Sequence, residues 1–370
     1  MSKRTIESFY KAVTPPKPKK PKTDEDSTLT YTTHPSYPHP IANLPPSIAA
    51  SLANITKNKD STPKRISDQP HLDLLYFHPL IPSPTARELF DFLRRELPFY
   101  RVKYSIRRGA QTTQISTPRF TTVFGVDETS LFLPASASAE AGSKDDVKLE
   151  DTSDTSLALA PSTSTLATSS TTTTTTSTLA LKDPRTHTPT PPTKYKHTPR
   201  PIPPCLDALR QAVQSAIGDS SSIYNFCLVN YYATGDDSIS YHSDDERFLG
   251  RNPSIASISL GAQRDFLMRH KPSKDAAVSF DNTPMKFALA SGDMVVMRGE
   301  TQANWLHSIP KRKGKGGEAS RGRINITFRK AVVPGGTENY YTYNVGSGGV
   351  YRWDEGRGEM CAVNGEESNV

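Results

Sequence analysis

The chain has 370 residues, of which only 35% are hydrophobic and 31 are proline, so a substantial part of it cannot be packed core. No apolar run approaches the roughly 18 residues of a membrane helix, and three cysteines without C-x-x-C spacing favour a cytosolic or nuclear protein over a disulfide or zinc framework. The net charge is +7, but residues 1–22 alone carry +6, so charge does not by itself predict that the remaining chain binds nucleic acid.

Residues 1–65 are rich in Pro, Ser, Thr and Lys without a sustained hydrophobic period, which predicts a disordered basic tail. Within it, Ile6, Phe9 and Tyr10 stand at i, i+3 and i+4, so one helical turn would present them as an apolar plug. Residues 17–22 read Lys-Pro-Lys-Lys-Pro-Lys, which is typical of a nuclear localisation signal, although a non-specific polycation would have the same composition.

Folded structure is expected to begin near residue 72. Residues 84–97 predict an amphipathic helix that Pro98 ends, because its apolar residues recur on one face. Residues 134–193 are dominated by Ser, Thr and Ala, which predicts a disordered insertion within one domain. A fold tolerates such an insertion because loop closure costs only about 0.6 kcal/mol more per doubling of length.

A second helix is expected from residue 204 to about residue 218, and short β-rich runs separated by Gly, Pro, Asn or Asp follow it. These runs are residues 226–232, 239–242, 255–260, 266–270, 287–290, 294–297 and 323–329. The pattern predicts a mainly β fold with flanking α: a double-stranded β-helix, or jelly roll, with two supporting helices and long disordered segments. We assign residues 66–334 to this domain and residues 335–370 to a C-terminal extension.

The run from Arg323 to Arg329 has two different faces, since alternate residues of a strand share a side. Ile324, Ile326 and Phe328 form an apolar face, and Arg323, Asn325, Thr327 and Arg329 form the other. An edge strand with one solvated face is the simpler interpretation. If the polar face lines a barrel interior, its guanidinium groups need anionic partners, and a dicarboxylate cosubstrate would give one carboxylate to each arginine.

His242 and Asp244 are two residues apart, so an extended chain directs the imidazole and the carboxylate to one side. Two histidines and one carboxylate are the usual holder of non-haem Fe(II), and we expect His307 to be the second histidine. The spacing is weak on its own, because His71 and Asp73 repeat it. We reject that pair because it precedes all the predicted strands.

The order of the motifs is more informative than any one of them. Along the chain come Asn230-x-Tyr232, His242-x-Asp244-Asp245-Glu246, Ser-Ile-Ser-Leu-Gly at 257–261, Ser-Gly-Asp at 291–293, His307, and Arg-x-Asn-x-Thr-x-Arg at 323–329. This series resembles the AlkB family of 2-oxoglutarate-dependent dioxygenases, and most closely its eukaryotic DNA-repair members. The likeness covers roughly residues 72–331 apart from the predicted insertion.

The resemblance implies Fe(II) as cofactor and 2-oxoglutarate as cosubstrate, with His242, Asp244 and His307 as the catalytic metal ligands. It implies a 2-oxoglutarate pocket formed by Asn230, Tyr232, Arg323, Asn325, Thr327 and Arg329. It also implies substrate-binding roles for Arg119, Phe124, Asp245 and Glu246, in which Arg119 pairs with Asp245 and Glu246 reads the exocyclic amine of a base. Phe124 stands where the family usually has Tyr.

The implied reaction is oxidative demethylation of N-alkylated bases such as 1-methyladenine and 3-methylcytosine in DNA, releasing formaldehyde, succinate and CO2. The base must be flipped or single-stranded to reach the metal. Five cations in the loop between Lys311 and Arg321 could contact phosphates. The alternatives are the same chemistry on RNA or protein, or a non-catalytic scaffold tethered to DNA or to a clamp.

The segment with Ile6, Phe9 and Tyr10 resembles the box by which replication proteins bind the sliding clamp PCNA, but it has Lys3 where that box usually has Gln. We therefore expect a nuclear protein, a monomer without membrane contact, whose partners are DNA and PCNA.

Overall fold

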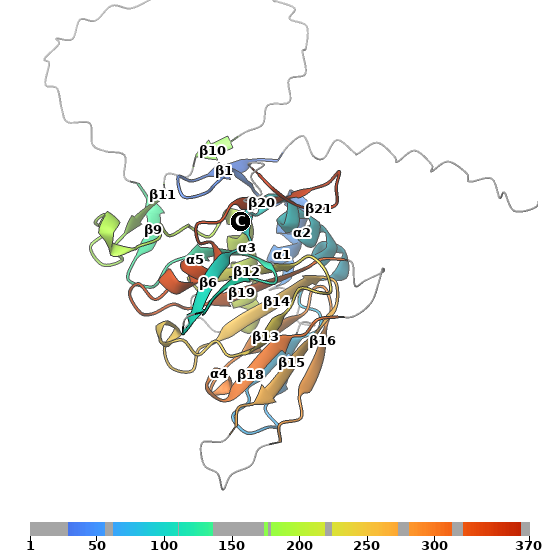
Figure 1. Cartoon of the computed structure of the whole chain (residues 1–370). Coiled ribbons are helices and arrows are strands. Elements are labelled where there is room, and N and C mark those ends of the chain that lie inside the picture. The colour runs from blue at the N-terminus through green and yellow to red at the C-terminus, as the bar shows by residue number, and fades with distance from the viewer. Residues whose placement is uncertain are drawn as a thin grey trace, which may run out of the picture.

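The computed structural model describes residues 29–55, 62–109, 111–135, 174–176, 179–218, 224–272, 281–312 and 321–363. The clamp-like residues, the predicted nuclear localisation signal and most of the basic loop after residue 312 lie outside these ranges. In the described part, helices cover one face of a large β-sheet and a smaller sheet lies at its other face (Figure 1). No described helix has both the length and the apolar character needed to cross a bilayer.

The larger sheet has ten strands in the order β21-β20-β5-β8-β12-β19-β14-β17-β4-β3. Its central strands are β12 (Phe226–Tyr232), β19 (Arg323–Arg329) and β14 (Ile255–Gly261), and β19 is antiparallel to both neighbours. The remaining strands are β3 (Lys64–Ile66), β4 (Leu74–Phe77), β5 (Phe99–Tyr100), β8 (Phe120–Gly125), β17 (Met294–Met297), β20 (Val350–Asp354) and β21 (Glu359–Ala362).

The smaller sheet has four strands in the order β13-β18-β15-β16. They are β13 (Ile239–His242), β18 (Trp305–Ile309), β15 (Arg264–His270) and β16 (Met285–Leu289). Three minor pairings complete the set: β6 (Lys103–Arg108) with β7 (Gln111–Ser116), β9 (Leu131–Pro134) with β11 (Leu179–Lys182), and β1 (Tyr31–Thr33) with β2 (Ile41–Ala42) and β10 (Thr174–Thr176).

Two predicted helices support the larger sheet. Helix α2 (Ser83–Glu96) buries an apolar face that includes Leu89 and Leu93, and it packs against β14 and β20. Helix α3 (Pro204–Ile217) has proline at its start, where no intrahelical N–H is lost, and ends at Gly218 with φ of 72°. Both helices pack against one face of the larger sheet and form one apolar core with it. The predicted jelly roll with two supporting helices is therefore confirmed.

The predicted tail contains folded structure that the sequence pattern did not reveal. Helix α1 (Pro46–Ile55) buries Ile48, Leu52 and Ile55 against the same core as α2 and α3. These residues recur at i, i+4 and i+7, but the helix is only ten residues long and lies in polar, proline-rich surroundings. The prediction of disorder up to residue 65 is wrong for residues 29–55 and for β3.

The predicted insertion is likewise shorter than the composition indicated. Strand β11 pairs with β9 in antiparallel register, so Leu179 lies opposite Pro134 and the chain returns to the point where it left. Residues 183–193 continue as turns and a short 3₁₀ helix (Pro192–Lys194). Residues 136–173 lie outside the described ranges.

The C-terminal extension is part of the same fold. Strand β20 pairs with β5 and β21 pairs with β20, so the two extend the larger sheet at one edge. The Arg94 guanidinium of α2 lies 3.7 Å from the centroid of the Trp353 ring, which fastens β20 to the helical layer. Helix α5 (Glu338–Asn344) precedes these strands and contacts β8.

The burial of α1 gives a stability prediction. Leu52 is 1% exposed, so Leu52→Ala removes a packed side chain and should lower the free energy of unfolding by about 2–5 kcal/mol. The matched control is Ala50→Gln on the exposed side of the same helix, which should change it by less than about 0.5 kcal/mol. Urea denaturation measures both, and equal midpoints for the two variants would mean that α1 does not pack on the core.

Candidate active site

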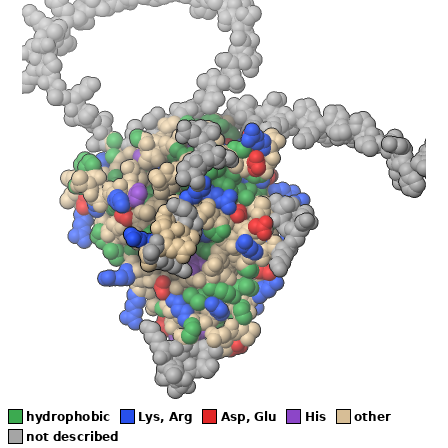
Figure 2. Space-filling model, viewed as in Figure 1, with side chains coloured by type: hydrophobic (Ala, Val, Ile, Leu, Met, Phe, Trp, Pro, Cys, Tyr) green, Lys and Arg blue, Asp and Glu red, His purple; other side chains and the backbone are tan. Residues whose placement is uncertain are grey.

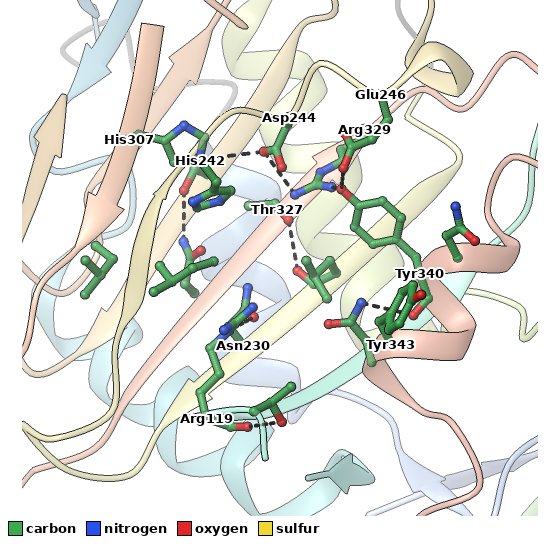
Figure 3. Close-up of a pocket in the computed structure, with 18 of the residues that line it drawn as sticks. Arg119, Asn230, His242, Asp244, Glu246, His307, Thr327, Arg329, Tyr340 and Tyr343 are labelled. Atoms are coloured by element: carbon green, nitrogen blue, oxygen red, sulfur yellow. Dashed lines mark hydrogen bonds and ion pairs between the residues drawn. The ribbon is translucent and has the colours of Figure 1, made fainter. Parts of the chain in front are cut away.

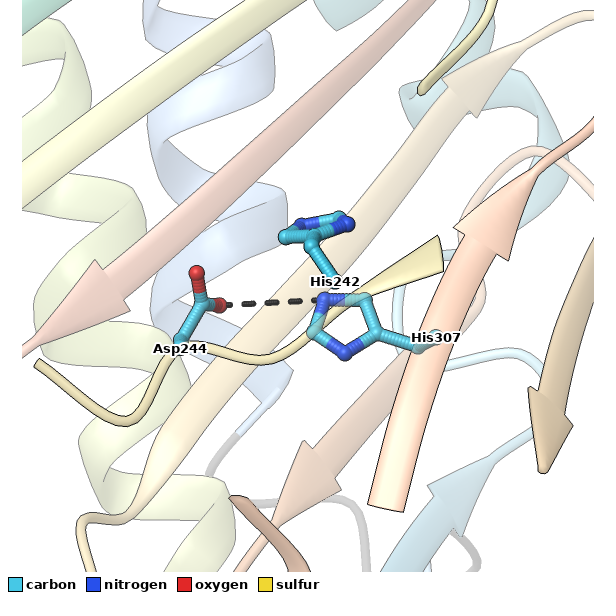
Figure 4. Close-up of side chains that lie close together, drawn as sticks. All are labelled: His242, Asp244 and His307. Atoms are coloured by element: carbon cyan, nitrogen blue, oxygen red, sulfur yellow. Dashed lines mark ion pairs between the residues drawn. The ribbon is translucent and has the colours of Figure 1, made fainter. Parts of the chain in front are cut away.

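Three side chains predicted to act together converge between the two sheets. His242 ends β13, Asp244 follows it by two residues, and His307 lies opposite His242 on the neighbouring strand β18. One potential ligand atom from each residue lies within 4.8 Å of the others, and the two imidazole centroids are 4.2 Å apart (Figure 4). It is the only group of three or more metal-ligating side chains among the described residues.

The competing pair, His71 and Asp73, lies elsewhere. The His71 ring contacts His270, and the Asp73 carboxylate accepts from Arg65 and Arg298 at 3.0 Å each. Their spacing therefore leads to no metal cluster among the described residues.

The ionisation of the cluster suits a divalent cation. Burial, together with the neighbouring His242, lowers the pKa of His307 to about 3, so its imidazole is neutral at physiological pH. Burial alone would raise the pKa of Asp244, but Arg329 and the two histidines outweigh it and lower that pKa. A neutral imidazole and an ionised carboxylate are the forms that bind metal.

Hydrogen bonds orient two members of the cluster. His242 Nδ1 lies 2.9 Å from the Ser240 carbonyl, which can only accept, so Nδ1 carries the proton and Nε2 keeps its lone pair. The backbone N–H of Asp244 donates to Gln302 Oε1 at 2.9 Å. Gln302 belongs to the short helix α4 (Thr301–Asn304), which holds the loop after β13 in place.

A pocket of about 940 Å³ surrounds the cluster (Figure 3). Its walls come from both sheets, and β19 contributes Arg323, Asn325, Thr327 and Arg329. The other face of β19, with Ile324, Ile326 and Phe328, packs in the core beneath the helices. The alternative of an edge strand with a solvated face is therefore wrong, because β19 is central and all its residues are buried.

Arg323 is a buried cation that forms no ion pair with a carboxylate of the described residues. Its side chain is 1% exposed, its Nη2 donates to Ser259 Oγ at 2.8 Å, and its guanidinium lies 5.3 Å from the Tyr232 ring centroid. Its Nε and Nη1 are buried without a hydrogen-bond partner among the described residues. Burial lowers its pKa to about 10, which still leaves it charged at neutral pH. Such a group fits a carboxylate ligand.

Arg329 has charged and polar partners at both Nη atoms, and its Nε has none among the described residues. Its Nη2 lies 3.1 Å from Asp244 Oδ2, and its Nη1 donates to the Tyr340 hydroxyl, which in turn donates to Glu246 Oε1 at 2.9 Å. We expected a dicarboxylate to give one carboxylate to each arginine. In the structure, Arg329 already pairs with the carboxylate of Asp244.

The remaining polar residues of the expected cosubstrate pocket fall into two groups. Arg119 Nε donates to Asn230 Oδ1 at 2.7 Å, so the Asn230 amide nitrogen remains a donor toward the pocket. Asn325 Nδ2 instead donates to Ser257 Oγ, and Thr327 Oγ1 donates to the Leu228 carbonyl. The latter two thus tie neighbouring strands together while lining the pocket.

Two of the expected substrate-binding residues line the pocket and two do not. Arg119 and Glu246 are lining residues. Phe124 is fully buried in the core on the helical side of β8, with its ring near Tyr37, because strand alternation turns it away from the pocket. Asp245 is largely exposed and pairs with Lys271 at 2.8 Å, so the expected pairing of Arg119 with Asp245 is wrong.

Sequence reasoning missed three residues at this site. Gln302 gave no signal, because a lone Gln beside a predicted strand has no distinctive pattern. Tyr340 and Tyr343 belong to a run of tyrosines in the C-terminal extension, and both line the pocket. The clustering of aromatic residues was visible, but nothing in the sequence indicated which surface it would meet.

Comparisons with known proteins agree with this geometry. The family model described as "2OG-Fe(II) oxygenase superfamily" matches residues 143–329, which is half of the chain. The human DNA oxidative demethylase ALKBH2 is 38% identical over 136 residues, covering 37% of this chain and 49% of that protein. The human alpha-ketoglutarate-dependent dioxygenase alkB homolog 3 is 38% identical over 127 residues, covering 34% and 42%.

A plant relative, the DNA oxidative demethylase ALKBH2 of Arabidopsis thaliana, is 34% identical over 144 residues, covering 35% of this chain and 43% of that protein. The chain thus spans about half the length of the curated relatives it matches. The solved structure of OsALKBH1 aligns with 36% of this chain and 68% of that one at a TM-score of 0.26 and 24% identity, a likeness too low to inform the fold.

Fe(II) and 2-oxoglutarate are the cofactor and cosubstrate of the matched family, and the donor set and the buried guanidinium fit both. The chain belongs to the 2OG-Fe(II) oxygenase superfamily, and within it to the AlkB family.

Proposed function

We propose that the protein is an oxidative demethylase that repairs N-alkylated bases such as 1-methyladenine and 3-methylcytosine in DNA. The observation that carries the proposal is the juxtaposition of two imidazoles and a carboxylate with a buried guanidinium in one pocket. Relatives named DNA oxidative demethylase support the choice of substrate. When bound, Fe(II) and 2-oxoglutarate supply the oxidation by O2 that hydroxylates an N-methyl group, which leaves as formaldehyde, while 2-oxoglutarate becomes succinate and CO2.

In this proposal His242, Asp244 and His307 would hold Fe(II), since two histidines and one carboxylate are the usual ligand set of non-haem iron oxygenases. Arg323 binds a carboxylate of 2-oxoglutarate through Nε and Nη1, which have no partner among the residues described, and the Asn230 amide donates to the same ligand. Asn325 and Thr327 hold the strands around it, and Tyr232 packs below the Arg323 guanidinium. Arg329 keeps the Asp244 carboxylate oriented.

Arg119 and Glu246 both line the pocket and are the residues proposed to contact the substrate. Burial, with the nearby Asp244, raises the pKa of Glu246, and its carboxyl group can face the exocyclic amine of a base. A base inside a duplex cannot reach this depth, so the substrate base is flipped out or single-stranded.

Sequence-independent affinity is attributed to basic residues that follow β18. Lys311 and Arg312 directly follow the segment that ends β18, the strand that carries His307. Figure 2 shows Lys and Arg side chains spread over one face with acidic groups among them, rather than in one continuous basic patch. Phosphate contacts of this kind add affinity that falls with salt but no base selectivity.

The proposed location is the nucleus and the proposed additional partner is the sliding clamp PCNA. The support is the composition of residues 17–22 and the spacing of Ile6, Phe9 and Tyr10, which the structure does not describe. The proposed state is a monomer.

The metal site yields the first prediction on function. Asp244→Ala removes the only carboxylate of the cluster, so Fe(II)-dependent formation of succinate should fall at least about 100-fold, since metal ligands outweigh the 10–100-fold effect typical of their supporting groups. Asp73→Ala is the matched control, because it alters the same His-x-Asp spacing away from the pocket. Calorimetric titration with Fe(II) under anaerobic conditions should show binding by the control and not by Asp244→Ala.

The buried guanidinium of Arg323 yields the second prediction on function. Arg323→Lys keeps a positive charge but loses the planar fork, so the KM for 2-oxoglutarate should rise by about 10-fold or more. The matched control, Arg298→Lys, alters a half-buried arginine that pairs with Asp73 away from the pocket. If succinate formation saturates at the same 2-oxoglutarate concentration in both variants, Arg323 does not bind the cosubstrate.

The substrate is tested with oligonucleotides of one sequence that carry 1-methyladenine or 3-methylcytosine, as single-stranded DNA, duplex DNA and RNA. We expect formaldehyde and repaired base from DNA, in amounts that match the additional succinate. Succinate formation without demethylation of any DNA would overturn the proposal, and preference for the RNA would reassign the substrate.

A further inference from the structure

Helix α5 forms one side of the active-site pocket although it comes from the C-terminal extension. Residues of α5 and of the turn before it line the pocket: Gly336, Asn339, Tyr340, Tyr343 and Asn344. In Figure 3, Tyr340 and Tyr343 stand on the side of the pocket opposite His242 and His307. The metal cluster and β19 thus form the floor, and α5 forms part of the wall around the opening.

Several hydrogen bonds fix α5 in this position. The Thr121 hydroxyl donates to the Asn344 carbonyl and the Tyr341 hydroxyl donates to the Gly125 carbonyl, each at 2.8 Å, so the middle and the C-terminal end of the helix contact β8. At the first turn, the Glu338 carboxylate accepts from the backbone N–H groups of Lys196 and His197 at 3.0 and 3.1 Å. The wall is therefore attached to the domain at three places.

Tyr340 links α5 to the residues of the active site. Its ring packs on Phe226 and Phe248 with centroid distances of 5.4 Å, and its hydroxyl joins Arg329 to Glu246. This hydrogen bond holds one Glu246 oxygen, which fixes the carboxyl group and leaves the second oxygen for a substrate. These contacts hold Tyr340 in place. They thereby also fix the position of Tyr343, which lies about one turn further along the same helix.

Tyr343 differs from Tyr340 in its exposure. Among the described residues, three large hydrophobic side chains are exposed: Val333 at 41%, Tyr343 at 51% and Val363 at 51%. The first two line the same pocket, and Val363 does not. A single exposed apolar residue is ordinary, but two at the rim of one pocket indicate a surface that contacts a ligand.

We propose that Tyr343 is a specificity-determining residue whose ring, together with Val333, contacts the face of the substrate base at the pocket opening. This rests on the proposed function, in which the substrate is an alkylated base. A base presents a flat π-face that stacks on aromatic side chains regardless of sequence. Methylation of a ring nitrogen makes that base a cation, which an aromatic ring attracts more strongly than the neutral repaired base. Tyr343 therefore favours the lesion over the product.

The experiment compares Tyr343→Ala and Tyr343→Phe with the wild-type chain. Val363→Ala is the control, since it removes an equally exposed side chain of the same extension away from the pocket. Three quantities are measured: succinate formed without nucleic acid, the KM for a 3-methylcytosine oligonucleotide, and the ratio of Kd values for unmethylated and methylated oligonucleotides from fluorescence anisotropy.

Tyr343→Ala should raise the KM about 10-fold, which corresponds to about 1.4 kcal/mol, and should lower the Kd ratio toward one. Tyr343→Phe keeps the ring and should stay within about twofold of wild type, as should Val363→Ala. Succinate formation without nucleic acid should be equal in all four proteins, which shows that the metal and cosubstrate sites are intact.

The two proposals fail in different ways. If wild type demethylates the oligonucleotide and Tyr343→Ala has the same KM and Kd ratio, the role of Tyr343 is overturned and the proposed function stands. If wild type forms succinate but neither binds nor demethylates any oligonucleotide, the proposed function is overturned and the base contact with it.

Discussion

Two guanidinium groups on one central strand impose the main constraint on this molecule. Arg323 and Arg329 are both buried, and a buried charge is tolerated only where an opposite charge or hydrogen-bond acceptors meet it. Asp244 meets Arg329, which ties the predicted metal site to β19, while two Arg323 nitrogens have no hydrogen-bond partner in the part of the chain that the structure describes. The pocket is thus arranged around one charge that the protein balances and one that suits an anionic ligand.

The same carboxylate connects the two halves of the site. Asp244 lies within 3.1 Å of Arg329 and 3.8 Å of His307, so it is shared between the cation on one sheet and the imidazole on the other. Gln302 fixes its backbone, and the Ser240 carbonyl fixes the tautomer of His242. The site therefore depends on supports that contain no metal-ligating side chain and that come from α4 and from the backbone of β13.

The elements that could be predicted are those in which a regular alternation of polar and apolar residues coincides with burial. The alternation along β19 separated pocket residues from core residues, and the order of motifs identified His307 despite the weakness of any single histidine. Prediction failed where long-range packing overrides composition, as for Leu52 in α1 and for β11. It also failed for Phe124 and Asp245, because a motif matched by position does not reveal which side of a strand or loop a side chain faces. The position of α5 could not be predicted, since no local pattern encodes contact with a distant pocket.

The pairing of β9 with β11 has a consequence for how this protein can vary. Since Pro134 and Leu179 lie opposite each other, both ends of the intervening stretch meet the domain at one place, in a two-stranded sheet separate from the sheet that holds β13 and β18. For chain ends held this close, closure entropy changes only logarithmically with the length of the connection. The adjacent ends at Pro134 and Leu179 accordingly make this connection a natural position for an inserted reporter domain, because the β9–β11 pairing fixes where the insertion joins the oxygenase.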